Sequence, residues 1–453
     1  MNIIVVGCGK IGTFIISRLV NEGHDVTVID SDSDVIAEVT NIYDVMGVCG
    51  NGPDSETLSE AGVEKCNLFI AVTGSDELNM LSCFIARKMG ALDTIARIRN
   101  PEYNDKSLGF IRQQMGLSMS VNPERLAAQE IFDILKFPSA LKIESFSRRS
   151  FEMIEIQLKK DSALDGMKLI DFQNKYKTRV LICAVQRNGE VFIPDGNFVI
   201  RAGDRIGLTA PRTENLKVLK ALGIMQKESR SVMILGGSKT AFYLSKMLLN
   251  HGTSVKIIEK NRSLCREFCD AMPKAVVING DGASQELLLE EGLAEQEAFV
   301  ALTGMDEENI LISMYAASQN VPKVISKINR SELIPMAEKL GLDCYVSPKD
   351  AVSDVVVRFA RALQNTLGSN VERMYKLMDG KAEALEFNVK SDCRFLGVPL
   401  KTLQLKSNTI IGGIIRDRKA ISPTGDDVFM AGDKVIVITT ADRILRDFSD
   451  IIK

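Results

Sequence analysis

The sequence predicts an α/β protein made of two tandem copies of one pair of domains: a parallel-sheet domain with helices on both faces, then a small α+β domain. Three observations predict this fold. Strand-like and helix-like segments alternate at the start of each half, short β-rich segments end each half, and the second half repeats the first 229 or 230 residues later. A repeat this long indicates duplicated domains, because solenoid repeats span about 20 to 50 residues.

The repeated positions are mainly glycines and polar residues of the kind that hold ligands. They include Gly7/Gly236, Lys10/Lys239, Gly23/Gly252, Asp30/Glu259, Thr73/Thr303, Gly74/Gly304, Asp76/Asp306, Asn79/Asn309, Arg187/Arg416 and Asp204/Asp433. We therefore expect the same ligand geometry to be kept in two copies.

Composition excludes several classes of function. A chain of 453 residues is too long for a single domain, since domains have about 100 to 200 residues. The net charge of −3 gives no general attraction to nucleic acid or anionic lipid. No run approaches about 18 apolar residues, so we expect no membrane insertion. The nine cysteines lack paired spacing, which favours reduced thiols in the cytoplasm and no metal site.

The first domain can be followed along the chain. An apolar run at 2–6, Gly-Cys-Gly-Lys-Ile-Gly at 7–12, helical spacing through Leu19 and a run ending at Asp30 predict strand, tight turn, helix and strand. Further strands are expected to about residue 49 and at 67–72 and 94–99, with helices at 54–61 and 76–89. This alternation predicts a parallel sheet.

Turn chemistry sets the remaining boundaries. Asn122 and Pro123 start a helix, and Arg-Asn-Gly and Ala-Gly-Asp turns separate the short strands that follow. We expect parallel-sheet domains at 1–122 and 230–348, crossing helices at 123–139 and 349–370, and small α+β domains at 140–226 and 371–453.

The glycine-rich turn predicts a dinucleotide site. Gly7 permits the turn, Gly9 lets a pyrophosphate approach the backbone, and Gly12 lets helix and strand pack closely. Asp30 ends the next strand, where it can accept hydrogen bonds from the ribose hydroxyls. Ser31 follows it, and no basic residue is placed to receive a 2′-phosphate, so NAD(H) is expected rather than NADP(H).

The second copy departs from this pattern. It reads Gly236, Gly237, Ser238, Lys239 and Thr240, so serine stands where the second glycine should be, and a serine there crowds the pyrophosphate. Glu259 keeps the ribose acid. Three outcomes stay open: weaker nucleotide binding, a different nucleotide, or none.

A second segment of each half follows the fourth strand. Ligands bind at the carboxyl ends of strands in open sheets, so Thr73, Gly74 and their copies Thr303 and Gly304 should face the crevice. We expect Asp76 to cap the next helix. On the fifth strand, Arg97 indicates a phosphate or acid partner, or a salt bridge to a neighbouring subunit.

Four stretches carry a resemblance to a known family: Gly-Cys-Gly-Lys-Ile-Gly, Val-Ile-Asp at 28–30, Ala-Val-Thr-Gly-Ser-Asp-Glu-Leu-Asn at 71–79 and Ile-Ala-Arg-Ile-Arg-Asn-Pro-Glu-Tyr at 95–103. They resemble the TrkA family of Trk potassium-uptake regulatory proteins, whose members carry two tandem RCK (KTN) units, each a Rossmann-like domain and a small C-terminal domain. The resemblance covers the whole chain.

The resemblance implies a cytoplasmic subunit, peripheral on the inner face of the cell membrane, that gates a Trk-type potassium-translocating membrane subunit as a homotetramer. NAD(H) would be its ligand, with ATP or ADP as alternatives at the same sites. By position, the family's contacts fall on Gly7, Cys8, Gly9, Lys10, Ile11, Asp30, Thr73, Gly74 and Arg97, and in the second unit on Gly236, Gly237, Ser238, Lys239, Thr240, Glu259, Thr303 and Gly304.

Two other functions remain as alternatives. One is an RCK-type regulator of another cation channel or transporter, since the sequence does not identify the membrane partner. The other is an NAD-dependent oxidoreductase, which needs a proton donor beside the nicotinamide. The chain has only two histidines and no recurring carboxylate cluster in its small domains, so we expect no enzyme and no catalytic residues.

Overall fold

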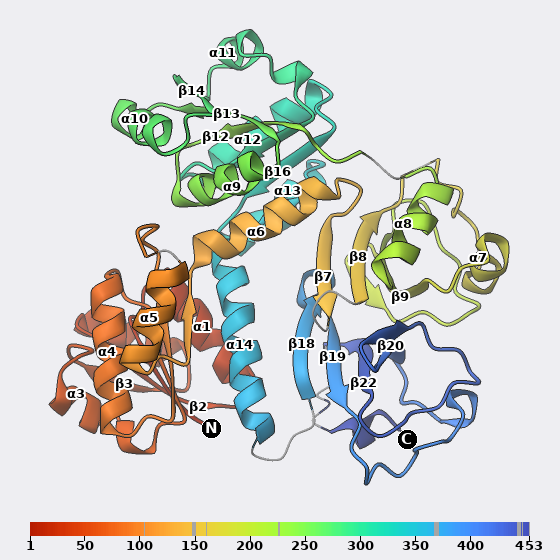
Figure 1. Cartoon of the computed structure of the whole chain (residues 1–453), viewed down its shortest axis with the longest axis horizontal. Helices are drawn as coiled ribbons and strands as arrows, with labels where there is room; N and C mark the ends of the chain where they lie inside the picture. Colours follow the sequence, from red (N-terminus) through yellow and green to blue (C-terminus); the bar gives the residue numbers. More distant parts are fainter. Residues whose placement is uncertain are drawn as a thin grey trace. The chain divides into compact units, whose positions relative to one another are not determined.

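The computed structural model describes residues 1–103, 105–146, 151–159, 161–224, 227–366, 371–441, 445 and 447–452. The chain forms two compact units, Met1–Ala128 with Val346–Ala360 and Gln129–Tyr345 with Arg361–Lys453. The first unit holds one parallel sheet, and the second unit holds the other three sheets (Figure 1). The predicted fold class is confirmed.

The first sheet has the strand order β3-β2-β1-β4-β5-β6 with every pair parallel, which is the order of a Rossmann sheet. Its elements are β1 (Asn2–Val6), α1 (Lys10–Asn21), β2 (Asp25–Asp30), α2 (Ser33–Ile42), β3 (Met46–Cys49), α3 (Ser55–Glu60), η1 (Val63–Lys65), β4 (Leu68–Ala71), α4 (Asp76–Met89), β5 (Asp93–Arg97), α5 (Asp105–Met115) and β6 (Met119–Val121).

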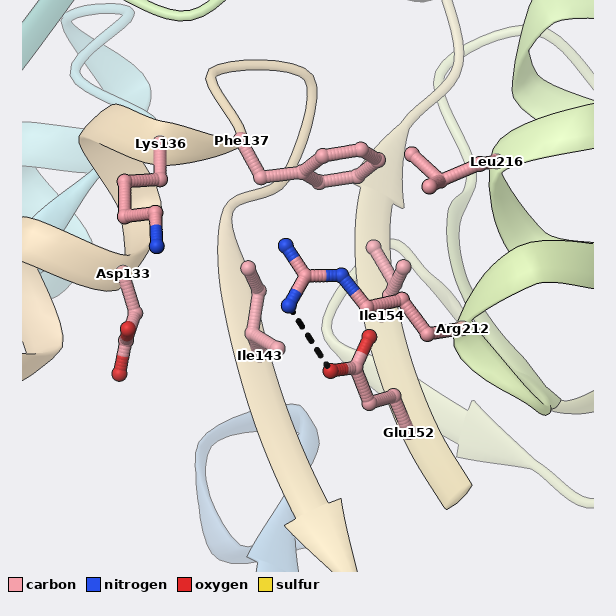
Figure 2. A pocket seen from close by; sticks show the side chains of 8 residues that line it. All are labelled: Asp133, Lys136, Phe137, Ile143, Glu152, Ile154, Arg212 and Leu216. Carbon is pink, nitrogen blue, oxygen red and sulfur yellow. Dashed lines mark ion pairs between the residues drawn. The ribbon is translucent and has the colours of Figure 1, made fainter. Parts of the chain in front are cut away.

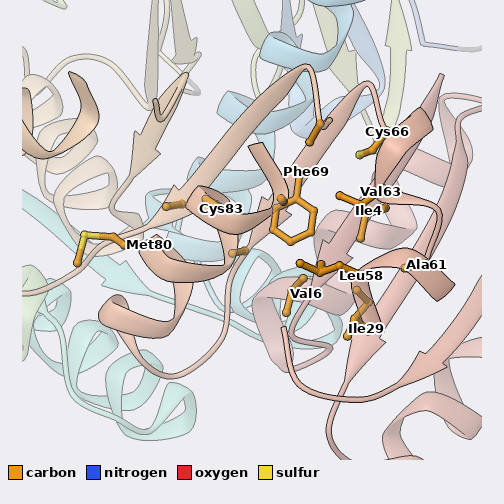
Figure 3. Packing of buried hydrophobic residues seen from close by; sticks show 14 of the residues in the cluster. Ile4, Val6, Ile29, Leu58, Ala61, Val63, Cys66, Phe69, Met80 and Cys83 are labelled. Carbon is orange, nitrogen blue, oxygen red and sulfur yellow. The ribbon is translucent and has the colours of Figure 1, made fainter. Parts of the chain in front are cut away.

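The central strands of this sheet are apolar along nearly their whole length because helices cover both faces. All four residues of β4 are buried, as are four of the five in β1. Ile4, Val6, Ile29 and Phe69 pack with Leu58 in one core (Figure 3). This rigid core fixes the carboxyl ends of β1, β2 and β4, where the predicted ligand residues lie.

The second parallel sheet repeats the first, with the order β14-β13-β12-β15-β16-β17. Its elements are β12 (Ser231–Leu235), α9 (Lys239–Asn250), β13 (Ser254–Glu259), α10 (Arg262–Ala271), β14 (Val276–Asn279), α11 (Gln285–Glu290), η3 (Leu293–Glu295), β15 (Ala298–Ala301), α12 (Asp306–Ser318), β16 (Lys323–Lys327), η4 (Ser331–Leu333), α13 (Ile334–Lys339) and β17 (Tyr345–Val346).

Two five-stranded antiparallel sheets form the small domains. The first small domain contains β7 (Lys142–Phe146), β8 (Phe151–Gln157), α7 (Leu169–Tyr176), β9 (Leu181–Arg187), β10 (Glu190–Phe192), β11 (Arg205–Ala210) and α8 (Arg212–Ala221). The second contains β18 (Val371–Leu377), η5 (Met378–Gly380), β19 (Ala382–Asn388), η6 (Leu400–Thr402), β20 (Thr409–Arg416), β21 (Lys419–Ile421), β22 (Lys434–Thr440) and η7 (Phe448–Ile451).

The two small sheets share one hydrophobic core. Phe146, Phe151 and Met153 of the first pack with Tyr375 and Ile438 of the second. A Cβ added to Gly413 would lie 2.7 Å from the Phe151 ring, so the two faces interlock at this point. The small domains therefore form a single sandwich, drawn in yellow, green and blue in Figure 1.

Two long helices connect the parallel sheets to the small domains: α6 (Pro123–Lys136) and α14 (Pro348–Thr366). In the first unit, the start of α14 packs on α1, where Asp350 pairs with Arg18 at 3.6 Å and Lys349 lies over the Phe14 ring. In the second unit, Phe132 of α6 contacts the ring of His251 edge-on at the end of α9. Each helix thus packs on the parallel-sheet domain of the other half.

Candidate nucleotide-binding sites

The first glycine-rich turn joins β1 to α1 and adopts a conformation that only glycine takes readily. Gly7 has a φ of +95°, and a Cβ there would lie 2.9 Å from the Thr73 amide nitrogen. A Cβ on Gly12 would lie 1.8 Å from the Gly7 carbonyl oxygen. The turn is therefore held close to both the start of α1 and the loop after β4.

Asp30 ends β2 beside this turn. Its carboxylate accepts hydrogen bonds from the amides of Cys8, at 2.7 Å, and Asp32, at 3.1 Å. The carboxylate thus has a structural role that the sequence did not reveal, since it fixes the turn. Each of its oxygens has a second lone pair for a ribose hydroxyl, so the structural role and the predicted ligand role are compatible.

The N-terminus of α1 has uncapped amides and a positive charge beside them. Its N-cap is Gly9, which has no side chain to accept the first amides, and its first turn, fully described, carries no acidic residue. Lys10 stands at the first helical position, where a cation opposes the positive end of the helix dipole. A Cβ on Gly9 would meet no atom within 4 Å, so the approach to these amides is open.

Thr73 and Gly74 lie in the loop between β4 and α4, and this loop is held by Asn79 from α4. The Asn79 side-chain oxygen accepts from the Thr73 amide and hydroxyl, both at 2.8 Å. Its amide nitrogen donates to the carbonyls of Thr73 and Arg97, at 3.3 and 2.9 Å. Asn79 is fully buried, so it clamps the loop to the end of β5.

Asp76 does not cap α4, and that expectation was wrong. The N-cap is Ser75, whose hydroxyl accepts from the Leu78 amide. The Asp76 carboxylate instead accepts from the amides of Arg99, at 2.9 Å, and Asn100, at 2.7 Å. It therefore joins α4 to the chain that leaves β5.

Arg97 ends β5 and is 8% exposed. One of its guanidinium nitrogens donates to the Thr73 carbonyl at 2.7 Å. Burial lowers the pKa of Arg97, and the neighbouring Arg99 lowers it further. Among the described residues, the hydrogen-bond partner of the Arg97 side chain is thus a backbone carbonyl, and this bond helps to hold the loop between β4 and α4.

The second half builds the same arrangement around a cleft of about 340 Å³. Gly236 has a φ of +94°, and the Glu259 carboxylate accepts from the amides of Gly237 and Asn261. The cleft is lined by Leu235, Gly236, Gly237, Ser238, Ile258, Glu259, Lys260, Leu264, Asp281, Gly282, Leu302, Thr303, Gly304, Met305 and Glu308.

Ser238 is the main local difference between the two turns. Its hydroxyl caps α9 by accepting from the Ala241 amide at 3.3 Å. The equivalent amide of α1 has no such side-chain acceptor at Gly9. Lys239 and Thr240 begin α9 as Lys10 and Ile11 begin α1, so the two turns differ in whether a side chain caps the first amides.

The loop after β15 repeats the clamp. Asn309 accepts from the Thr303 amide at 2.8 Å and donates to the Lys327 carbonyl at 3.0 Å. Lys327 replaces Arg97 and donates to the Leu302 carbonyl at 3.4 Å. The sequence analysis identified Asn79 and Asn309 only as repeated residues and did not predict that they hold the loops. Their recurrence in both halves was the one sign in the sequence that they have a structural role.

Cys8 lies between the two glycines of the first turn. Burial raises the pKa of its thiol to about 12, and the nearby Asp30 charge contributes. The thiol is therefore neutral at physiological pH and unsuited to nucleophilic chemistry. In the described residues we find no cluster of His, Cys, Asp or Glu side chains that fits a metal ion.

A smaller pocket of about 40 Å³ lies in the second unit between α6, β7, β8 and α8 (Figure 2). Glu152 and Arg212 face each other across it at 3.9 Å, with Phe137 and Leu216 closing one side. This volume is of the order of one or two water molecules and well below the roughly 300 Å³ at which ligand pockets begin. It does not compete with the crevices as a nucleotide site.

Family models match both halves of the chain. The TrkA-N domain matches residues 3–119 and 232–348, and the TrkA-C domain matches residues 153–223 and 384–452. The chain belongs to the TrkA family. The predicted resemblance is thereby confirmed.

Curated TrkA relatives cover nearly the whole chain. A Trk system potassium uptake protein TrkA homolog from Archaeoglobus fulgidus is 31% identical over 444 residues, 98% of each chain. TrkA homolog 1 from Methanosarcina mazei is 30% identical over 450 residues, 97% of this chain and 98% of its own. The tandem TrkA organisation is therefore shared over the full length.

Solved structures agree on the TrkA fold. The GsuK RCK domain superposes with a TM-score of 0.63 at 17% identity, covering 97% of this chain and 92% of its own. The GsuK channel bound to NAD gives a TM-score of 0.63 at 16% identity, covering 97% and 77%. At this identity the likeness concerns the fold. Among the described helices of this TrkA chain, we find none with the length and apolar character needed to cross a bilayer.

Proposed function

We propose that this chain is the nucleotide-responsive regulatory subunit of a Trk-type potassium uptake system. NAD(H) binds in the first crevice, with ATP or ADP as competing ligands, and the bound nucleotide is a signal that is not consumed. The observation that carries this proposal is the open N-terminus of α1, where Gly9 leaves the amides uncapped and Lys10 adds a positive charge, next to a turn that the Asp30 carboxylate holds.

That arrangement is electrostatically unfavourable without an anion. A lysine at the first position of a helix opposes the dipole by about 0.3 to 1 kcal/mol, and no side chain caps the first amides. A pyrophosphate placed over Gly9, Lys10 and Ile11 would satisfy both. The adenosine ribose would then reach Asp30, and Thr73 and Gly74 would form the opposite wall of the crevice.

The ligand has a route to conformational change through Thr73. The loop that carries Thr73 is clamped to β5 by Asn79 and supported by Arg97, so a ligand that moves the loop also moves the end of β5. To regulate, a nucleotide must prefer one state, typically by about 1 to 3 kcal/mol. Reduced and oxidised nicotinamide differ in ring charge, which offers one source of that preference.

The relatives support the Trk assignment. Proteins about 30% identical to this chain over nearly their full length are named as Trk system potassium uptake proteins. We propose that this chain likewise acts on a Trk-type potassium-translocating membrane subunit, as a homotetramer on the inner face of the membrane. An RCK-type regulator of another cation channel shares the fold, and only the identity of the partner separates the two.

The test has two parts. Calorimetric titration of the purified chain with NADH, NAD, ATP and ADP should give saturable binding with a defined stoichiometry per chain. Co-expression with a Trk-type membrane subunit should give a complex that survives purification. Absence of nucleotide binding would contradict the ligand assignment, and binding without complex formation would favour a different membrane partner.

A further inference from the structure

A partly buried ion cluster in the second unit connects four segments that are far apart in the sequence. Arg205, the first residue of β11, has a side chain only 12% exposed and pairs with Glu155 of β8. Its other terminal nitrogen donates to Asp379 of η5 at 2.8 Å. The hydroxyl of Tyr345 in β17 donates to the same Asp379 carboxylate at 3.0 Å.

The first small domain thus contributes two members, and the second small domain and the second parallel sheet contribute one each. Arg205 and Glu155 belong to the first small domain, Asp379 to the second, and Tyr345 to the edge strand of the parallel sheet. Only arginine can donate to two carboxylates at once from a planar fork, so Arg205 is the centre of the cluster. We call Arg205, Glu155, Asp379 and Tyr345 the latch.

The latch holds a strained turn. Met378 and Asp379 have φ angles of +48° and +58°, a left-handed conformation that is unfavourable for side chains other than glycine. The Glu155 carboxylate accepts from the Met378 amide at 3.0 Å, and Arg205 holds Asp379. A strained turn persists only where its surroundings fix it, which here means contacts from the other small domain.

A continuous set of bonds leads from the second crevice to the latch. Asn309 holds Thr303 in the crevice loop and donates to the carbonyl of Lys327 at the end of β16. The preceding residue, Ser326, donates its amide to the Cys344 carbonyl at 3.1 Å. Tyr345 follows directly in the chain. A shift of the crevice loop can therefore reach Asp379 through β16 and β17.

The sequence does not repeat the latch residues at the corresponding positions. Tyr345 lies shortly before Pro348, the first residue of α14. Ser120 lies at the same distance before Pro123, the first residue of α6, and its side chain is too short for this role. Lys434 replaces Arg205 and pairs with Glu386 at 3.6 Å. The segment corresponding to η5, residues 147–150, lies outside the described residues and contains no acid in its sequence.

We infer that the latch transmits the state of the second crevice to both small domains, with Arg205, Asp379 and Tyr345 as positioning residues. This inference rests on the proposed nucleotide-responsive function, which it extends to one half of the chain. A change at Thr303 in the second crevice is passed through Tyr345 and alters the turn at Met378.

The test uses the full chain and hydrogen exchange of the peptide from Met374 to Lys381. Tyr345→Phe removes only the hydroxyl, so the fold should survive. Tyr315→Phe is the matched control, since within the described residues the Tyr315 hydroxyl makes no hydrogen bond. We expect about tenfold faster exchange in this peptide for Tyr345→Phe and no change for Tyr315→Phe. Equal exchange in both variants would overturn the latch.

Transmission is tested with two perturbations of the second crevice. Saturating ADP, with binding followed by calorimetry in an Asp30→Asn background, should change exchange in this peptide, and Tyr345→Phe should abolish the change while ADP still binds. Asn309→Ala loosens the crevice loop without a ligand and should act in the same way. If ADP does not bind, the proposed second site fails, and the Asn309→Ala result alone decides the latch. An equal response with and without the Tyr345 hydroxyl contradicts the inference.

Discussion

Asp30 and Cys8 are joined by a hydrogen bond of 2.7 Å from the Cys8 amide to the carboxylate. Through this bond, the residue expected to bind ribose also holds the turn expected to bind pyrophosphate. The two halves of the predicted dinucleotide site are therefore coupled before any ligand arrives. The same bond recurs between Gly237 and Glu259 in the second half.

Asp30→Asn tests this coupling. The asparagine side chain keeps one oxygen to accept from the Cys8 backbone amide, but the substitution removes the charge that a ribose hydroxyl would contact. Losing a charge-assisted hydrogen bond costs about 1.5 to 3 kcal/mol, so NADH affinity should fall by about tenfold or more. Calorimetry with NADH measures the change, and Glu259→Gln in the second crevice is the matched control. Unchanged affinity in Asp30→Asn would rule out the ribose contact.

Ser238→Gly should improve the second crevice. It removes the hydroxyl that caps the Ala241 amide and restores the open N-terminus found at Gly9. Freeing one amide for a phosphate should strengthen ADP binding by about tenfold, with a loss of only a few tenths of a kcal/mol in helix capping. The reverse change, Gly9→Ser, should weaken the first site. If Ser238→Gly gives no gain, capping is not what limits the second crevice.

Asn79→Ala should loosen the first crevice loop. It leaves the partly buried Thr73 amide without its acceptor, at a cost of about 1 to 3 kcal/mol in unfolding free energy. We expect a lower melting temperature together with weaker NADH binding at the first crevice. Asn309→Ala should destabilise to a similar extent and leave binding at the first crevice unchanged. Equal loss of first-crevice binding in both variants would show that the clamps act globally.

Cys49 reports on ligand placement. Its exposed side chain lies beside Asp30, to which it is paired in the strand register, and its thiol donates to the Ser31 carbonyl at 3.8 Å. A ribose at Asp30 should shield it, so NADH should slow alkylation of Cys49 at pH 8. Exposed Cys269 on α10 is the internal control and should react at the same rate with or without NADH.

Cys8 should stay unmodified throughout that experiment. Its thiol is buried, and its pKa is raised to about 12, so at pH 8 almost none of it is thiolate. Because the folded-state pKa lies above the thiol's ordinary value of 9.0, the neutral thiol's contribution to stability is complete below about pH 9 and is lost as pH rises toward 12. Rapid alkylation of Cys8 at pH 8 would contradict this environment.

The features of the site that depend on local backbone conformation could be predicted from the sequence. The left-handed φ of Gly7, the close contact at Gly12 and the acid at the end of β2 all follow from a short motif with fixed spacing. Asp76 was misread because a carboxylate at a helix start is usually a cap, whereas here its partners are backbone amides 23 and 24 residues away. Ser75, one residue earlier, takes the cap.

Contacts between segments that are far apart in the chain could not be predicted from the sequence. Arg205 and Asp379 are 174 residues apart, and no spacing rule relates them. The packing of α14 on α1 likewise depends on which domain each long helix meets, and the amphipathic pattern alone does not decide that. The shared core around Phe151 and Tyr375 arises because neither small sheet covers its inner face alone.

We propose that the first crevice holds NAD(H) as a signal and leaves it chemically unchanged. The most direct measurement is an NADH titration of the full chain by calorimetry, with the reduced nicotinamide absorbance followed in the same sample. We predict saturable binding that Asp30→Asn weakens by about tenfold or more, with the absorbance constant over hours. No binding, or steady loss of the reduced form, would contradict the account.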